Sequence, residues 1–253
     1  MKRGLYILRL VLCLSLCLTQ LFEISALAVS SVQTAQSVSI QDIETITEDG
    51  KAERKLTEEE KTAIRAMIDA EAILASNEMF SPEKAISVLE SIFAQWVLAG
   101  RPVPNGKNPF LVSVKKEDEK YLPALFWAYN NKLLIYGEDV KKVNSRLQLA
   151  DLSRNQSRID MIEDLYREWC IDFPEVKASE KPAADVALNG GGKSHVYADA
   201  LAWALAEGII KENELKKKAD GLYFEPEKAV TRVQASLWLY RFHACMEAEK
   251  AKQ

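Results

Sequence analysis

The sequence predicts a mainly α-helical protein built from three tandem helix–loop–helix repeats. The stretch FEPEKAVTRVQASLWLYRF at 224–242 has a partial copy, FSPEKAISVLESIFAQW, at 80–96, and a weaker copy, QSRIDMIEDLYREW, at 156–169. Ser87, Ser157 and Thr231 occupy equivalent places in the three copies, 70 and 74 residues apart. Repetition of this kind is typical of proteins in which similar structural elements pack against one another in series.

The first 28 residues are expected to be a signal peptide. Lys2 and Arg3 give a positive start, an apolar run extends to Phe22, and Ala26-Leu27-Ala28 supplies the small residues of a cleavage site. A transmembrane anchor is the alternative, but no positive stop-transfer segment follows. We therefore expect export, followed by a linker or disordered segment at 29–55 that is rich in Ser, Thr and Gln and then charged.

The folded part is expected to begin at residue 56. Thr57 and Glu60 have the spacing of a capping box, which predicts a helix at about 58–76. The second helix of each repeat carries the same signal, in the pairs Ser87 and Glu90, Ser157 and Asp160, and Thr231 and Gln234. The shorter Asp160 is a poorer reciprocal partner, although its charge favours a helix start. Apolar residues follow each cap at helical spacing.

A further helix is expected ahead of the capped helix in the second and third repeats, at 121–134 and 197–210. Tyr121 and Trp127 match Tyr197 and Trp203. Gly208 predicts the C-terminal end of the later helix, because glycine readily adopts a left-handed conformation. Lys132 stands where that glycine would be, so Asn130 and Asn131 are expected to supply the left-handed ending.

Charge and cysteine content limit the classes of function. Without Lys2, Arg3, Arg9 and Glu23 of the signal peptide, the 33 basic and 37 acidic residues become 30 and 36, a net charge of −6. This balance argues against nucleic acid and anionic lipid as partners, because both need a basic surface. Two cysteines remain, Cys170 and Cys245. Export permits a disulfide between them, but free thiols are favoured because cysteine packs well as a small hydrophobe.

The sequence lacks the patterns of a catalytic or metal centre. It has two histidines and neither a CxxC nor an HExxH spacing. No serine or cysteine nucleophile pairs with a histidine in a recognisable motif. We therefore expect a non-catalytic protein without a cofactor.

The third repeat resembles an S-layer homology (SLH) repeat. The resemblance rests on YADALAWALAEGII at 197–210, Asp220-Gly221, Phe224, Pro226 and Val230-Thr231-Arg232. The second repeat keeps Ser157-Arg158 but lacks the loop glycine and proline, and the first has Val88 in place of the arginine. The resemblance divides the chain into a degenerate repeat at 56–107, a second, also degenerate, at 108–180 and a third at 181–253.

The resemblance implies a pseudo-threefold, mostly helical module that attaches exported proteins to the cell wall. Modules of this family bind secondary cell-wall polysaccharides, often carrying pyruvate ketals, in grooves between repeats. The implied location is therefore secreted, at the cell surface or in the wall. A structural or protein-interaction module that keeps the fold but has lost glycan binding, with other surface proteins as partners, is the alternative.

The residues expected to bind the glycan carboxylate lie at helix starts. The resemblance implies this role for Arg232, with Thr231, and for Arg158, with Ser157. A helix start offers N–H groups and the positive end of the helix dipole, and an arginine adds a planar fork that suits a carboxylate. Tyr197 and Trp203 are candidate sugar contacts, although Trp203 also falls on an apolar stripe that predicts a core position.

Overall fold

The computed structural model describes residues 45–46, 54–73, 80–110, 116–134, 139–143, 146–178, 180–186 and 194–252. The chain divides into two compact units, Met1–Ser39 and Ile40–Gln253, and every described residue belongs to the second. The expected signal peptide at 1–28 therefore lies outside the described residues.

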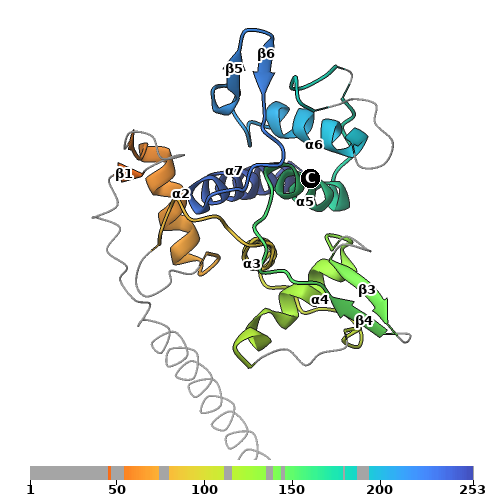
Figure 1. Ribbon diagram of the computed structural model, residues 1–253. Helices are drawn as coiled ribbons and strands as arrows, with labels where there is room; N and C mark the ends of the chain where they lie inside the picture. The colour runs from red at the N-terminus through yellow and green to blue at the C-terminus, as the bar shows by residue number, and fades with distance from the viewer. Residues whose placement is uncertain are drawn as a thin grey trace, which may run out of the picture. The chain divides into compact units, whose positions relative to one another are not determined.

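The described part of the chain is mainly α-helical, as the sequence predicts (Figure 1). Its α-helices are α2 (Glu58–Asp69), α3 (Val88–Leu98), α4 (Leu122–Asn130), α5 (Arg158–Asp172), α6 (Ser194–Ala206) and α7 (Arg232–Lys250). The short 3-10 helices are η2 (Lys116–Tyr121) and η3 (Glu212–Glu214). Three antiparallel pairs join β1 (Thr45–Ile46) to β2 (Arg54–Lys55), β3 (Val140–Val143) to β4 (Arg146–Leu149), and β5 (Lys216–Lys218) to β6 (Gly221–Tyr223).

The predicted helix caps are confirmed. Helices α3, α5 and α7 each begin directly after Ser87, Ser157 and Thr231, whose hydroxyl oxygens accept a hydrogen bond from the third amide of the helix. The boxes of α2, α3 and α7 are complete in both directions, whereas only the forward bond is present at α5. Each such cap contributes about 1 kcal/mol to stability, so the starts of these helices are fixed by local sequence.

The predicted ends of the first helices are correct in one case and wrong in two. Gly208 has φ +70° just after α6, as expected. The second helix, however, ends with Lys132 itself at φ +60°, while Asn131 has φ −92°. The helix expected at 58–76 stops at Asp69, and Glu71 takes φ +58°. All three helices are therefore followed by a residue with positive φ, even where that residue is not glycine. A left-handed residue with a side chain costs about 1–2 kcal/mol of folding free energy.

This strain gives a prediction about stability. Replacing the exposed Lys132 with glycine should raise the free energy of unfolding by about 0.5–1 kcal/mol, because glycine adopts positive φ without a steric penalty. Gly208→Ala is the matched opposite and should lower it by about 1 kcal/mol, since no atom lies within 4 Å of the added Cβ and only the backbone is strained. Urea unfolding of both variants measures the two changes in the free energy of unfolding. Two changes of the same sign would contradict this account.

The segments that precede α3, α5 and α7 are joined by a closed ring of backbone hydrogen bonds. We call residues 80–88, 150–158 and 224–232 the cap segments. The amide of Ile86 donates to the carbonyl of Val230, Val230 donates to Gln156, and Gln156 donates to Ile86, each at 2.9 Å. Isolated bridges pair the same segments, Ala85 with Thr231, Ser87 with Asn155 and Ser157 with Ala229. The three cap segments, which are far apart in the sequence, are thus held together by backbone hydrogen bonds.

Helix packing follows the same circular order. Helix α4 packs against α3, α6 against α5, and α2 against α7 (Figure 1). Each of these pairs therefore joins the first helix of one predicted repeat to the second helix of another. The pair formed by α2 and α7 connects the beginning of the described chain to its end.

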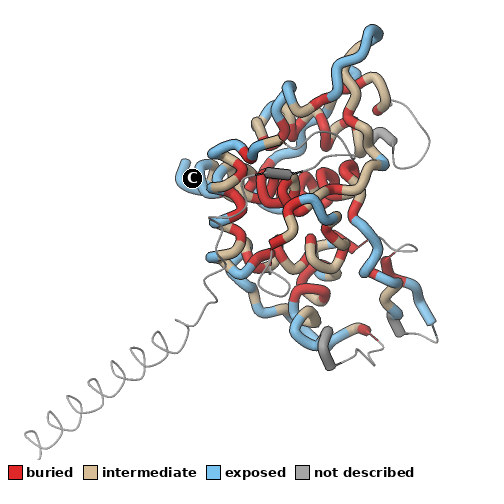
Figure 2. The backbone as a smooth tube through the Cα atoms, turned by 60° about the vertical axis from the view of Figure 1, so that its left-hand side comes forward, coloured by how far each residue is buried: buried red, intermediate tan, exposed pale blue. Residues whose placement is uncertain are grey.

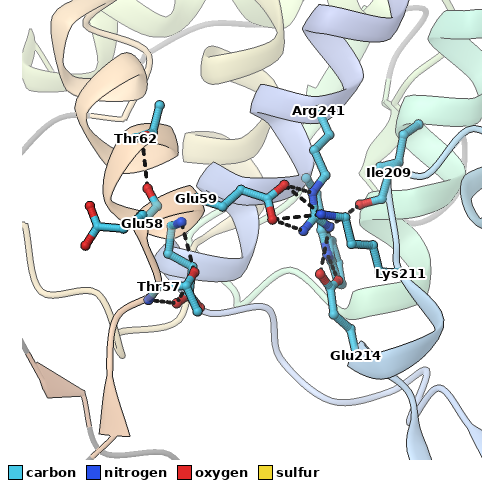
Figure 3. Close-up of polar contacts among 10 residues, drawn as sticks. Thr57, Glu58, Glu59, Thr62, Ile209, Lys211, Glu214 and Arg241 are labelled. Atoms are coloured by element: carbon cyan, nitrogen blue, oxygen red, sulfur yellow. Dashed lines mark hydrogen bonds and ion pairs between the residues drawn. The ribbon is translucent and has the colours of Figure 1, made fainter.

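An ion-pair cluster fixes α2 against α7 (Figure 3). Glu59 of α2 accepts hydrogen bonds from Arg241 of α7, at 2.8 and 3.0 Å, and from Lys211, at 2.8 and 3.0 Å. Arg241 also donates to the Ile209 carbonyl (2.9 Å) and to Glu214 (2.7 Å). Hydrogen bonds from Arg241, opposed by burial and assisted by Lys211, lower the pKa of Glu59 to about 2.

The buried side chains form two clusters. The larger contains Trp203, Trp238, Phe80 and Phe224 and joins helices α2, α5, α6 and α7. The smaller joins α4 and the β3–β4 hairpin to Val88 and Ile92 of α3. Buried positions concentrate in the helices, whereas strand β5 is exposed (Figure 2).

The segment at 29–55, expected to be a linker or disordered, contains a short hairpin in its last part. Thr45–Ile46 pairs with Arg54–Lys55 in an antiparallel hairpin. Arg54 then donates two hydrogen bonds, at 2.9 and 2.6 Å, to Glu60 of α2. Strands of two residues are too short to carry a periodic pattern, so no sequence signal indicates them. Residues 29–44 lie outside the described part of the chain.

Candidate functional site

The candidate site is built around Arg158, the first residue of α5. Its side chain is buried, and its guanidinium lies over the ring of Phe224 at 4.7 Å and near that of Trp238 at 5.6 Å. Its ion pair with Glu225 is long, at 3.9 Å, and Glu225 is also held by Lys216 at 2.9 Å. A guanidinium that contacts an aromatic ring still carries a planar fork of N–H donors, whose geometry matches that of a carboxylate.

Arg158 lines a groove of about 270 Å³ that we call the Arg158 groove. Its walls come from β2, α2, α5, η3 and α7 and are formed by Arg54, Glu60, Arg158, Asn213, Glu214, Gln234, Leu237 and Trp238. All three predicted repeats, together with the β2 strand, therefore contribute side chains to one groove.

The carboxylates of the Arg158 groove have close cationic partners. Glu60 is held by Arg54, and Glu214 by Arg241 at 2.7 Å. Burial disfavours the ionised form of Glu60, but hydrogen bonds from Arg54 and Thr57 outweigh it and lower its pKa. Glu60 thus remains ionised at neutral pH, and each of the two acids is paired with an arginine. The groove offers a second cation, Arg54, and the amides of Asn213 and Gln234 as hydrogen-bonding groups.

Arg232, the residue most strongly expected to bind a ligand, is enclosed by protein. Its side chain is 2% exposed. One terminal nitrogen donates to the Phe80 carbonyl at 2.7 Å, the other to Glu90 at 3.2 Å, and the guanidinium lies 5.3 Å from the Phe80 ring. These contacts tie α7 to the cap segment at 80–88 and to Glu90 of α3. The Arg158 side chain is nearly as buried, at 5% exposed, but it lines the Arg158 groove. This placement favours Arg158 over Arg232 as a ligand contact, the reverse of the sequence-based order.

The starts of α3, α5 and α7 do not offer their first N–H groups to a ligand, which corrects another expectation. The first two amides of each helix donate to carbonyls of a neighbouring cap segment: Val88 and Leu89 to Arg154 and Leu152, Arg158 and Ile159 to Lys228 and Pro226, and Arg232 and Val233 to Lys84 and Pro82. The third amide donates to the cap hydroxyl. The hydroxyls of Thr231 and Ser157 therefore serve their own helices, and anion binding depends on the arginine side chain.

The two candidate sugar contacts lie in different environments. Tyr197 of α6 is half-buried and donates from its hydroxyl to Asp160 at 2.9 Å, next to the start of α5. Trp203 is fully buried among Tyr166, Trp169 and Phe242. The assignment of Trp203 as a sugar contact is therefore wrong, because its apolar stripe faces the core.

The start of α3 differs from the other two because Val88 replaces the arginine. Val88 is buried with Leu152 and Val140 in the smaller apolar cluster. This cap segment therefore contacts its neighbour through apolar side chains. The three equivalent positions thus hold an enclosed guanidinium, a guanidinium in a groove, and an aliphatic side chain.

Arg54 is the functional candidate that sequence reasoning missed. It falls in the segment expected to be a linker, and no local pattern marks it. Gln234 was recognised only as the reciprocal partner in the cap of α7, although it also lines the Arg158 groove. Its equivalence to Glu90, which contacts Arg232, is the signal that would have linked it to an arginine.

Comparison with known proteins gives no family for this chain. No protein-family model matches it, and a search of curated proteins finds no match. Any functional assignment therefore depends on the residues and the geometry described above.

Three further findings concern the described residues. None of their helices is both long and apolar enough to cross a membrane. Among these residues, no group of three or more His, Cys, Asp or Glu side chains is placed to hold a metal ion. Cys170 and Cys245 are free and half-buried, and burial is the main cause that raises the pKa of each thiol, to about 11 for Cys245.

Proposed function

We propose that this is an exported, non-catalytic protein that binds a secondary cell-wall polysaccharide through three SLH-like repeats in a pseudo-threefold arrangement. The hydrogen-bond ring supports the repeats, because Ile86, Gln156 and Val230 occupy equivalent positions and donate the same bond in turn. The circular order of helix packing supports the same symmetry. The sequence of residues 1–28 supports export to the cell surface.

The placement of Arg158 is the observation on which the binding proposal depends. A pyruvate ketal presents a small carboxylate on a sugar ring, and the guanidinium fork of Arg158 can take that carboxylate. The amides of Gln234 and Asn213 are placed to bond neighbouring hydroxyls. A charge-assisted hydrogen bond of this type contributes about 1.5–3 kcal/mol.

Sedimentation with wall sacculi tests this function. Purified residues 29–253 should sediment with native sacculi and remain in solution with sacculi stripped of secondary polymer. Arg158→Gln should weaken sedimentation about tenfold or more, given the loss of a charge-assisted bond, and Arg158→Lys should lie between the two. Arg101→Gln, at an exposed arginine paired with Glu71, is the control that should bind normally.

Unchanged circular dichroism must accompany the loss in Arg158→Gln. Equal sedimentation with native and stripped sacculi would rule out the glycan, and normal binding by Arg158→Gln would rule out the Arg158 groove as its site.

A structural or protein-interaction module is the second candidate. It is favoured by Arg232, whose guanidinium bonds the Phe80 carbonyl and Glu90, and by Val88, which leaves the start of α3 without a guanidinium. On this account the protein sediments with neither form of sacculus and is instead retained by other surface proteins of the same cell.

A further inference from the structure

A second cavity lies near the C-terminal ends of α5 and α7, whereas the Arg158 groove lies near their N-terminal ends. It has a volume of about 370 Å³ and is bordered by the C-terminal ends of α3 and α4, the last turn of α5 and the second half of α7. We call it the Glu168 cavity. Its size is at the lower end of the range of about 300–1,000 Å³ that small-molecule sites occupy.

A buried carboxylate in this cavity has an unsatisfied oxygen. Glu168 of α5 is 8% exposed, and its Oε2 accepts no hydrogen bond from any described residue. Leaving a buried acceptor unpaired costs about 1–3 kcal/mol, and more for a charged group. Burial, opposed by Lys250 and reinforced by Asp172, raises the pKa of Glu168 to about 8.

The surroundings of Glu168 favour a cation. Asp172 and Glu247 also line the cavity, and the last carbonyls of α3 add the negative end of that helix dipole. Lys250 lines it too, with its side chain half exposed and 4.0 Å from Glu247. The walls include Trp127 and Phe242, whose ring faces attract cations.

We propose that the Glu168 cavity binds the protonated primary amine of a small organic molecule, with Glu168 as the carboxylate that accepts its hydrogen bond. Calcium and magnesium ions fit less well, because they take six or more oxygen ligands, and the described residues offer no cluster of His, Cys, Asp and Glu that could hold a metal ion. An ammonium group needs only one close carboxylate and apolar or aromatic walls for its carbon skeleton. This proposal does not depend on the Arg158 groove.

Binding is coupled to ionisation of Glu168. An empty cavity holds this carboxyl mainly in its neutral form at pH 7, and an ammonium partner favours the ionised form, so binding releases a proton. With a pKa of about 8, the affinity for an amine that stays charged should rise roughly tenfold between pH 7 and pH 9. The charged or titratable side chains that face Glu168 are Asp172 on α5 and His243, Glu247 and Lys250 on α7; α3 and α4 contribute Leu98, Trp127 and Asn131.

The experiment is an NMR titration of the full protein with n-butylamine, following the indole N–H signal of Trp127. 1-Butanol is the neutral control of the same size, and glucosamine against glucose asks whether an amino sugar is also accepted. We expect saturable shifts with amines, none with the alcohol or glucose, and an affinity for butylamine that rises from pH 7 to pH 9. Glu168→Gln should weaken amine binding tenfold or more and remove the rise, whereas Glu58→Gln, at an exposed acid of α2 outside the cavity, should keep both.

Equal shifts from butylamine and butanol would overturn the proposal, as would a Glu168→Gln variant with unchanged affinity and pH profile. Glutamine has the shape of the protonated acid, so this variant should fold. If it does not fold, the pH profile of butylamine binding to the unsubstituted protein and the comparison with 1-butanol still test the proposal. Glu168→Gln should leave sacculus binding unchanged and Arg158→Gln should leave amine binding unchanged, so the two proposals fail separately.

Discussion

Replacing Arg232 with methionine is expected to lower the free energy of unfolding by about 3 kcal/mol, the range seen when one partner of a buried polar pair is removed. Methionine retains the apolar volume of the arginine stem but leaves the Phe80 carbonyl without its 2.7 Å donor and Glu90 without its cation. Because these bonds join α7 to the cap segment at 80–88, the loss should appear as global unfolding at lower urea concentration.

A double-mutant cycle with Glu90→Gln isolates the contact. Glutamine can still complete the capping box with Ser87, so this change removes the charge at 90 and keeps the cap. We expect Glu90→Gln to cost less in the Arg232→Met background than alone, with a coupling of about 1–2 kcal/mol. A loss below 1 kcal/mol for Arg232→Met would show that the arginine is not structural and would restore it as a ligand contact.

The helix starts could be predicted from sequence because their signals are local. Thr57, Ser87, Ser157 and Thr231 each bond an amide three residues away, so the pattern and the structure involve the same few residues. The helix ends were harder, since Lys132 takes a left-handed conformation that its residue type disfavours. Tertiary packing imposes this left-handed ending, and no conformational preference of the local residues indicates it.

The difference between the two arginines could not be predicted, because it depends on which cap segments meet. Arg232 faces the cap segment at 80–88, with Glu90 beyond it, whereas Arg158 faces the one at 224–232, with Gln234 beyond it. Glu90 and Gln234 are equivalent in the repeat alignment. The circular order therefore places a carboxylate beside Arg232 and an amide beside Arg158, whose ion pair is with Glu225 instead.

Replacing Arg241 with methionine is expected to lower the free energy of unfolding at pH 7 by about 2–3 kcal/mol. The change removes the donors that join Glu59 of α2 to α7 and leaves Glu214 without its cation (Figure 3). Lys61→Met is the exposed control, because its pair with Glu58 lies within one helix and such pairs contribute about 0.5 kcal/mol or less. Urea unfolding compares the two; equal losses would mean that the cluster does not hold α2 in place.

The same cluster should make stability depend on acid pH. The pKa of Glu59 is about 2 in the folded protein, below the value of about 4.3 expected when unfolded. Its contribution is therefore fully present above that unfolded value and is lost as the pH falls towards 2. Glu59→Gln should be less stable than the unsubstituted protein at pH 7, with the difference shrinking between pH 4.5 and 2. Because Glu59 is partly exposed, 0.5 M salt should also reduce this difference at pH 7. A difference that stays constant from pH 7 to pH 2 would show that the Glu59 carboxylate does not fasten α2 to α7.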